Sequence, residues 1–563
     1  MFCQKQYTLK VIHDAPESFN FNKKIHFKKT HPNLTAAKNE ALKIVNQLQA
    51  SSRITSNLDS LITDSLKNVT AYIHVGAPFK WTYLKSGNAE EEVLSSIGFR
   101  EKIFLNKPFN QNQLYKFYER IIKYYENNGY PFASVQLDSI QLHSNEVAAK
   151  LNINKGPLYK IDSIIIKGNA NISPHYIYNS IKLKPGDLYN ETILQEIPKR
   201  LKEIPFVTEK EKMNLKFYEK QAKLYLYLKK KKASRFNGIL GFLPDENTGK
   251  LQLTGELQLS LLNGFGNGEL IDFHWRSLQQ NTQNLNFKFN YPFIFQSSFG
   301  VDYDFKLFKK DTLFIEVKHK IGVRYILKGN NYFKVFINTN TSNLLSDKGF
   351  STLTVLPSYA DVKSTLYGIE GYFNKLDYKY NPTKGFEFNI QGATGNKSIA
   401  KNPKLNPILY EGIQLNSNLY NALFDGRIFF PIVKRHIVMY RNNSAYIYNE
   451  NLFENELMRI GGLKTLRGFN EESIFASLYS INTIEYRFIL EQNSYLFTFF
   501  DWAYYEKNTI IDPIIDTPFG FGTGISFETK AGIFTLNYAL GKQFDNPILI
   551  RNAKIHFGFV NFF

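Results

Sequence analysis

The chain has 563 residues, of which 43% are hydrophobic, so it is too long for one ordinary globular core and too apolar for a disordered chain. Its 69 Lys and Arg outnumber its 50 Asp and Glu and give a formal net charge of +19, but these charges are interleaved along the chain. This scatter favours a solvated surface that attracts anionic lipid headgroups over a nucleic-acid partner. The single cysteine, Cys3, excludes an intramolecular disulfide and a cysteine-based zinc site.

The start of the chain, Met1-Phe2-Cys3-Gln4, does not form a complete signal peptide, and we expect the natural start to lie upstream. No run of 18 apolar residues occurs, so no transmembrane helix is predicted. The mean hydropathy of −0.31 is compatible with a soluble protein and also with a membrane barrel, whose strands alternate apolar and polar residues.

Residues 1–232 contain amphipathic helices separated by short strands. Apolar residues recur at helical spacing in three segments, Thr35–Gln49, Gln113–Asn127 and Glu191–Ile204. Short stretches rich in apolar and alternating residues predict strands at Glu146–Ile153, Lys160–Lys167 and Lys223–Leu228. The pattern predicts small α+β units.

An internal repeat of nearly 80 residues runs through this region. Four pairs of similar segments occur in the same order: LDSL at 58–61 with LDSI at 137–140, GAPFKW at 76–81 with GPLYKI at 156–161, KSGNA at 85–89 with KGNA at 167–170, and KPFN at 107–110 with KPGDLYN at 184–190. Chance explains one such pair but not four in consistent order. We therefore divide the region into three tandem units, 1–77, 78–157 and 158–232.

From about Ser234 the pattern changes to alternation. Apolar side chains occupy every second position in Leu285–Phe295, Phe299–Leu307 and Ile484–Leu490. The polar face rarely turns apolar, whereas a sandwich would need a second apolar layer. A transmembrane barrel fits, because lipid covers its outside and water fills its inside. At roughly 20 residues per strand and connection, residues 233–563 predict an all-β barrel of about 16 antiparallel strands.

Motifs of the common enzyme and cofactor classes are missing. The chain contains no GxxxxGK[ST] phosphate loop and no HExxH zinc-protease motif. The glycine string Gly520–Gly524 lies in alternating strand sequence with no helix after it, so it does not predict a dinucleotide site. The ten His are dispersed, and no two carboxylates stand out as an acid–base pair. We therefore expect no enzymatic activity, no cofactor and no metal.

The segment Gly461–Phe469 reads GGLKTLRGF and is the most informative stretch of the chain. It resembles the (V/L)RG(F/Y) signature in the sixth extracellular loop of the BamA/TamA family of outer-membrane insertases. The three tandem units are similar to that family's POTRA domains, each a βααββ module. The final strand, ending at Phe563, is similar to the aromatic-terminated signal of outer-membrane barrels. That signal comprises Phe557, Phe559 and Phe563.

In that family the loop arginine folds into the barrel and meets acidic residues on the inner faces of nearby strands. The resemblance therefore predicts a latch of Leu466, Arg467, Gly468 and Phe469. Phe499-Phe500-Asp501 is similar to the family's F-x-D element, and alternation places Phe499 and Asp501 inward. Glu485 is the candidate glutamate of the preceding strand. The family's glycine two residues after the aspartate is Ala503 in this chain.

Ordering a long loop inside a wide barrel costs conformational entropy. A guanidinium can hold such a loop in place, because its planar fork forms directional, charge-assisted bonds to carboxylates. Gly468 would permit the tight turn behind Arg467.

The resemblance implies three periplasmic POTRA units followed by an outer-membrane barrel at 233–563. It implies a factor that helps fold and insert client proteins at the outer membrane. The expected partners are outer-membrane lipids, unfolded outer-membrane or secreted client proteins, and periplasmic or inner-membrane accessory proteins.

Two other functions fit parts of the sequence. Two-partner-secretion transporters share the family fold and pass a polypeptide through the lumen, but they typically carry two POTRA units and an N-terminal plug helix after a Pro-rich linker. Three units without such a linker favour the insertase. A passive diffusion porin would need neither POTRA-like units nor a latched loop.

Overall fold

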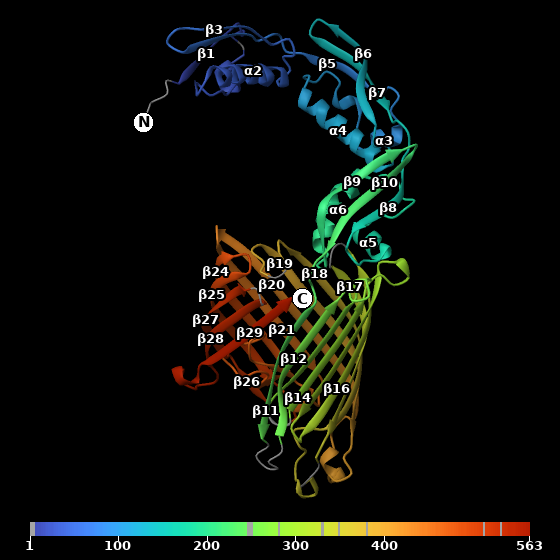
Figure 1. Cartoon of the computed structure of the whole chain (residues 1–563), viewed down its shortest axis with the longest axis vertical. Helices are drawn as coiled ribbons and strands as arrows, with labels where there is room; N and C mark the ends of the chain where they lie inside the picture. Colours follow the sequence, from blue (N-terminus) through green and yellow to red (C-terminus); the bar gives the residue numbers. More distant parts are fainter. Residues whose placement is uncertain are drawn as a thin grey trace. The chain divides into compact units, whose positions relative to one another are not determined.

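The computed structural model describes residues 6–17, 19–244, 251–279, 282–327, 331–346, 350–378, 381–510, 513–529 and 532–562. These residues form three small sheets, a two-stranded hairpin and one barrel (Figure 1). Within them, no helix is both long and apolar enough to cross a membrane.

The first sheet has the strand order β2-β1-β4-β3, and its central pair β1 and β4 is parallel. Its elements are β1 (Tyr7–His13), α1 (Phe21–Lys24), β2 (Thr30–His31), α2 (Leu34–Ala50), β3 (Asn57–Thr63) and β4 (Asn68–His74). Asn33 caps α2 by accepting a hydrogen bond from the amide of Ala36 at 2.8 Å. The buried face of α2 is the predicted apolar stripe of Ala37, Ala41, Ile44, Val45 and Leu48. The short strand β2 is an addition to the βααββ order that the sequence predicted.

The second and third sheets follow the βααββ order and share one topology, β5-β7-β6 and β8-β10-β9. The second comprises β5 (Lys80–Lys85), α3 (Glu91–Ser96), η1 (Glu101–Ile103), α4 (Gln111–Asn127), β6 (Ser134–His143) and β7 (Glu146–Asn154). The third comprises β8 (Lys160–Gly168), α5 (Pro174–Ile181), α6 (Glu191–Glu203), β9 (Val207–Tyr218) and β10 (Gln221–Lys230). Every helix and strand that the sequence predicted here is present, with ends shifted by one or two residues.

Glycines mark equivalent positions in the second and third units. Gly76 and Gly156 have φ of 64° and 67°, and each lies four residues before the first strand of the unit that follows it. Gly87 and Gly168 also have positive φ. A Cβ at Gly87 would lie 1.7 Å from the carbonyl oxygen of Leu151, and a Cβ at Gly168 would lie 2.1 Å from that of Leu228. Both positions therefore require glycine because the backbone of the last strand passes too close.

The remaining sheet closes into an antiparallel barrel (Figure 1). The strands β26 and β27 both pair with β25 and share one place in the wall, so the barrel has 16 strands, which confirms the expected fold class. In chain order the wall strands are β11 (Arg235–Pro244), β12 (Leu251–Leu262), β13 (Leu270–Gln279), β14 (Thr282–Tyr291), β15 (Phe299–Lys310), β16 (Phe314–Ile326), β17 (Tyr332–Leu344), β18 (Asp361–Leu376), β19 (Gly385–Ala400), β20 (Asn416–Val433), β21 (His436–Tyr448), β24 (Leu478–Glu491), β25 (Ser494–Lys507), β26 (Ile514–Asp516), β27 (Phe519–Thr529), β28 (Gly532–Lys542) and β29 (Lys554–Phe562).

Connecting segments add five short 3₁₀ helices and one small hairpin to the described part of the barrel. These are η2 (Ile294–Gln296), η3 (Phe350–Thr352), η4 (Pro407–Tyr410), η5 (Glu454–Glu456), η6 (Ile550–Asn552), β22 (Met458–Ile460) and β23 (Ile474–Ala476).

The wall separates an apolar exterior from a polar interior. On β17, Phe333, Val335 and Ile337 point outward and are exposed, while Lys334 on the opposite face is buried. Register carries the same face across neighbouring strands, since Val335 pairs with Val323 on β16 and with Ile369 on β18. This is the arrangement of a barrel whose outside meets lipid.

We keep the four-part division at 1–77, 78–157, 158–232 and 233–563 as a proposal. The sheets described above fall one to each of these ranges.

Replacing Gly168 with Ala should destabilise the third unit. The substitution combines a strained positive φ with a clash against the Leu228 carbonyl, and we expect a loss of about 1–3 kcal/mol. Urea unfolding of a fragment covering residues 1–232 measures this. Gly186→Ala is the matched control, because Gly186 also has positive φ but nothing lies within 4 Å of its would-be Cβ. Equal losses in the two variants would contradict a role for the close backbone approach.

Candidate functional site

A loop of residues 449–477, here called the inner loop, connects β21 to β24 and lies across the barrel lumen. It contains η5 and the hairpin of β22 and β23. Arg459 of the loop lies 3.6 Å from the Glu316 carboxylate on β16. A Cβ at Gly468 would lie 2.6 Å from the Leu540 carbonyl on β28. The loop therefore touches well-separated parts of the wall.

The guanidinium of Arg467 joins this loop to two carboxylates on the wall. Its Nε and Nη2 donate to the two oxygens of Asp501 at 2.8 and 2.7 Å, a bidentate pairing. Its Nη1 donates to Glu485 at 2.6 Å. The backbone amide of Arg467 also donates to Asp501, at 3.1 Å. Both acidic residues lie on the inner face, Glu485 on β24 and Asp501 on β25.

Further side chains complete this ion cluster. Thr483 donates its hydroxyl to Asp501 at 2.8 Å, and Arg487 donates to the second oxygen of Glu485 at 2.8 Å. The guanidinium carbon of Arg467 lies 3.5 Å from the centre of the Phe499 ring, so the aromatic face covers the cation. Asp501 is 0% exposed and Glu485 is 5% exposed. Carboxylates buried to this extent need a cation, and Arg467 and Arg487 supply it.

The other residues of the predicted latch pack beside the cluster. Leu466 is fully buried, and Gly468 has a φ of 92°. Phe469 is also buried and lies against Gly541 on β28.

Glycines in the wall make room for the loop. A Cβ at Gly520 on β27 would lie 1.9 Å from the carbonyl oxygen of Arg467. Gly522 and Gly524 share that inner face, where added Cβ atoms would meet the rings of Phe499 and Phe497. The glycine string that sequence analysis set aside as a dinucleotide motif therefore has a structural part in admitting the loop and the aromatic side chains beneath it.

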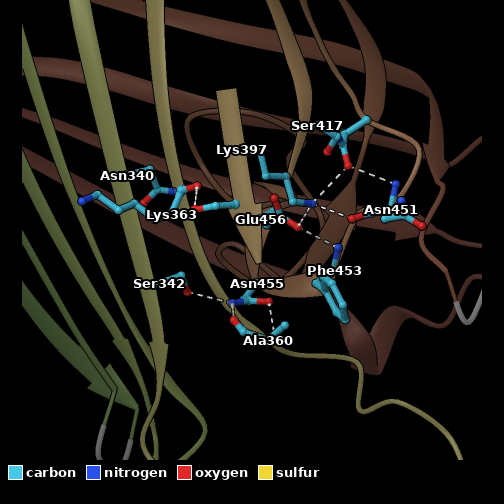
Figure 2. A network of polar contacts seen from close by, with 12 residues as sticks. Asn340, Ser342, Ala360, Lys363, Lys397, Ser417, Asn451, Phe453, Asn455 and Glu456 are labelled. Carbon is cyan, nitrogen blue, oxygen red and sulfur yellow. Dashed lines mark hydrogen bonds and ion pairs between the residues drawn. The ribbon is translucent and has the colours of Figure 1, made fainter. Parts of the chain in front are cut away.

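A second ion pair holds the first part of the inner loop. Figure 2 shows Lys397 of β19 and Glu456 of η5 pointing at each other, and their Nζ and Oε2 atoms are 2.6 Å apart. Their side chains are 0% and 3% exposed. The Lys397 ammonium also donates to the backbone carbonyl of Asn451 at 2.5 Å and to the Asn449 side chain at 3.2 Å. All three of its donors therefore have acceptors.

Asn455 joins the same segment to a third stretch of the wall (Figure 2). Its side-chain amide donates to the Ser342 hydroxyl on β17 at 2.7 Å and to the Ala360 carbonyl at 2.8 Å. Its side-chain oxygen accepts from the Ala360 amide at 3.2 Å. The loop is thus held at several points besides Arg467.

Sequence reasoning missed part of this site. Arg487 follows Glu485 by two residues and shares its inward face, so alternation carried a signal for it. Lys397, Glu456 and Asn455 had no such signal, because their contacts depend on which strands the loop passes inside the barrel.

The predicted C-terminal signal is placed only in part. Phe557 is exposed on the outer face of β29, and Phe559 packs against Phe534 of β28 with ring centres 4.5 Å apart and planes tilted by 34°. Phe563 lies outside the described residues. Across the described chain, no group of three or more His, Cys, Asp or Glu is placed to hold a metal ion.

Comparisons with known proteins agree with this architecture. The POTRA family model, described as a surface antigen variable number repeat, matches residues 159–217, which cover the third unit from β8 into β9. CdiB from Escherichia coli is similar over 93% of this chain and 96% of its own, at 13% identity and a TM-score of 0.56. CdiB from Acinetobacter baumannii is similar over 86% of this chain and 90% of its own, at 14% identity and a TM-score of 0.53.

The chain has the fold of the two CdiB structures, with POTRA-like modules followed by a 16-strand antiparallel barrel. A structure of BamA from Haemophilus ducreyi lacking POTRA domains 1–3 is similar over 85% of this chain and all of its own, at 14% identity and a TM-score of 0.46. No curated protein sequence matches the chain. The apolar exterior of this barrel agrees with a wall whose outside meets lipid.

Replacing Arg467 with Ala should weaken the barrel by about 3–5 kcal/mol, because it leaves Asp501 and Glu485 buried with less compensating charge. Arg467→Lys should restore only part of this loss, since an ammonium cannot form the bidentate pairing. Urea unfolding in detergent micelles measures the change in stability. The heat-modifiable migration of the barrel on gels reports how much of the barrel is folded. Arg551→Ala, in the exposed 3₁₀ helix η6, is the control. An unfolding curve for Arg467→Ala that matches this control would show that the ion cluster does not stabilise the barrel.

The second ion pair should behave as a coupled unit. Glu456→Leu or Lys397→Met alone leaves one charge buried without its partner, and each should destabilise the barrel by about 3–5 kcal/mol. The double variant removes both charges and should lose less than either single variant. The same unfolding assay measures all three. Strictly additive losses would mean that the two side chains are not coupled.

Proposed function

We propose that this protein is an outer-membrane assembly factor that helps client barrel proteins fold and insert, without covalent chemistry. The observation that carries the proposal is the weak seam between the first and last strands. In the described residues, β11 pairs with β12 from Arg235 to Pro244, but with β29 only at Arg235 and Phe236. The last strand β29 pairs with β28 from Lys554 to Val560. Figure 1 shows β11 and β29 close together only near the C-terminus of the chain.

The seam has few interactions to keep it closed. Beyond the paired residues, the Asn237 side-chain amide donates to the Phe559 carbonyl at 2.8 Å. Gly238 and Gly241 lie in β11 and weaken it as a strand. Separating β11 from β29 would expose two unpaired edges, and an exposed edge is a template on which another strand can form. A client strand that pairs there would enter the membrane with its backbone groups satisfied.

The POTRA units offer further strand edges on the way to the barrel. In the second unit, β6 is an edge strand and exposes Ile140 and Leu142 by 55% and 61%. An extended client segment could add to such an edge through backbone hydrogen bonds. Unfolded outer-membrane proteins are therefore the clients we propose, with periplasmic accessory proteins as further partners.

In this proposal Arg467 and its two carboxylates act as the latch of the inner loop. The loop crosses the lumen. The latch would therefore keep the lumen filled by the loop while the seam between β11 and β29 opens. A passive porin would not need such a loop.

A polypeptide transporter of the two-partner-secretion type is the second candidate. It is supported by the polar interior and by the structural similarity to the two CdiB proteins over nearly the whole chain. A transporter would pass its client through the lumen, which requires the inner loop to leave its place rather than the seam to open.

A disulfide across the seam separates the two functions. Phe236 and Asn561 face each other in register, so Phe236→Cys with Asn561→Cys should form a disulfide once Cys3 is replaced by Ser. The assay is the folding of a client barrel into proteoliposomes that contain the full chain. The oxidised variant should lose its acceleration of client folding, and a reductant should restore it.

The control is a disulfide between β27 and β28, built from Thr523→Cys and Tyr538→Cys, which also face each other in register. It should leave client folding unchanged. Full activity with the seam locked would overturn the insertase proposal, and passage of a secreted polypeptide through the locked barrel would establish the transporter.

A further inference from the structure

The outer wall of the barrel carries four polar side chains on the neighbouring strands β21 and β24. They face each other in register, Asn442 with Asn482 and Ser444 with Ser480, and are here called the outer polar patch. Alternation places them on the same face of the wall as the exposed Tyr446 and Ile484. The next residue on β24, Thr483, points the other way and donates to Asp501 in the lumen.

Apolar and aromatic side chains surround the outer polar patch. Along β21 the patch lies between the outward side chains of Tyr440 and Tyr446. Across the strands, Phe424 on β20 faces Ser444, and Trp502 on β25 faces Asn482. The patch therefore lies within the band of the wall that meets lipid, where acyl chains offer no hydrogen-bond partner.

Hydrogen bonds join the members of the patch into one network. The Asn442 side-chain amide donates to the Ser480 hydroxyl at 3.1 Å and to the Asn482 side-chain oxygen at 2.9 Å. The Asn442 oxygen accepts from the Ser444 hydroxyl at 2.8 Å. The Tyr440 hydroxyl donates to the Asn482 oxygen at 2.7 Å. These bonds fix the direction in which each amide presents its remaining donors and acceptors.

The network leaves hydrogen-bonding groups of both kinds unused. Among the described residues, the side-chain amide nitrogen of Asn482 has no acceptor, and neither has the indole N–H of Trp502 beside it. The Tyr440 oxygen accepts no hydrogen bond from the described chain, and the Asn442 oxygen accepts one where it could accept two. A polar group that faces hydrocarbon without a partner raises the free energy of the membrane-inserted barrel. The patch is therefore suited to a partner that brings both acceptors and donors into the membrane.

We propose that the outer polar patch is the contact surface between two copies of this chain in the membrane. A two-fold axis through the patch would bring the Asn482 donors of each copy to the Tyr440 and Asn442 acceptors of the other, so one patch satisfies its own needs by reciprocity. Small outward residues lie beside it on β20, where Ala422 and Gly426 face Tyr446 and Asn442 in register. Small residues and polar side chains drive the association of membrane-spanning helices, and the same forces act between two barrel walls. The patch lies away from β11 and β29, so this proposal does not depend on the proposed function.

Sedimentation equilibrium of the full chain in neutral detergent micelles measures the dissociation constant of such a dimer. We expect Asn442→Leu with Asn482→Leu to weaken association about tenfold or more, because both amides of the network are lost. The matched control is Thr339→Val with Thr365→Val, which removes another pair of outward polar side chains that face each other in register, on β17 and β18. Heat-modifiable migration shows that each variant barrel is folded.

Cross-linking in intact outer membranes locates the contact. In a chain with Cys3 replaced by Ser, a short bis-maleimide should join two copies through Ile484→Cys, which lies next to the patch on β24. It should not join them through Val335→Cys, an equally outward and exposed position on β17. A monomer in micelles together with no cross-link at either cysteine would overturn the proposal. Equal weakening in the two double variants, or a cross-link from Ile484→Cys to lipid or to a different protein only, would also overturn it.

Discussion

The pairing of one guanidinium with two carboxylates on the barrel wall is the interaction on which the rest of the interior depends. Asp501 is fully buried and takes two hydrogen bonds from the Arg467 guanidinium, and Glu485 takes a third. Without the cation these acids would be buried at a high cost. The wall has room for the loop that carries Arg467, because Gly520 leaves space for the Arg467 backbone and Gly541 leaves space for Phe469. Sequence and packing thus agree on one position for the inner loop.

Charge is distributed along the whole length of this loop. Glu456 pairs with Lys397 near its start, Arg459 lies against Glu316 further along, and Glu472 pairs with Arg276 on β13 at 2.8 Å. Moving the loop would require several of these pairs to separate together, which favours a loop that stays while the seam opens.

The spacing of apolar residues in the sequence predicted the strand faces and the helix faces, which depend only on residues close together in the chain. Period-two alternation placed Asp501 and Glu485 on inner faces, and helical spacing identified the buried stripe of α2. The resemblance to the BamA/TamA loop signature selected Arg467 from among the arginines of the chain. The pairing of Lys397 with Glu456 could not be predicted, because it joins residues 59 apart through the path of a loop inside a closed barrel. The short strand β2 was also missed, since a two-residue strand has no periodicity to detect.

The position of the inner loop is the central claim, and a cross-link inside the barrel tests it most directly. Leu463 of the loop approaches within 3.8 Å of where a Cβ at Gly558 on β29 would lie. With Cys3 replaced by Ser, Leu463→Cys and Gly558→Cys should form a disulfide in intact outer membranes, and adding Arg467→Ala should lower its yield. Thr535→Cys with Gly558→Cys, paired in register on β28 and β29, gives the yield of a fixed contact. Cross-linking of this control pair without any cross-linking of the loop pair would contradict the account.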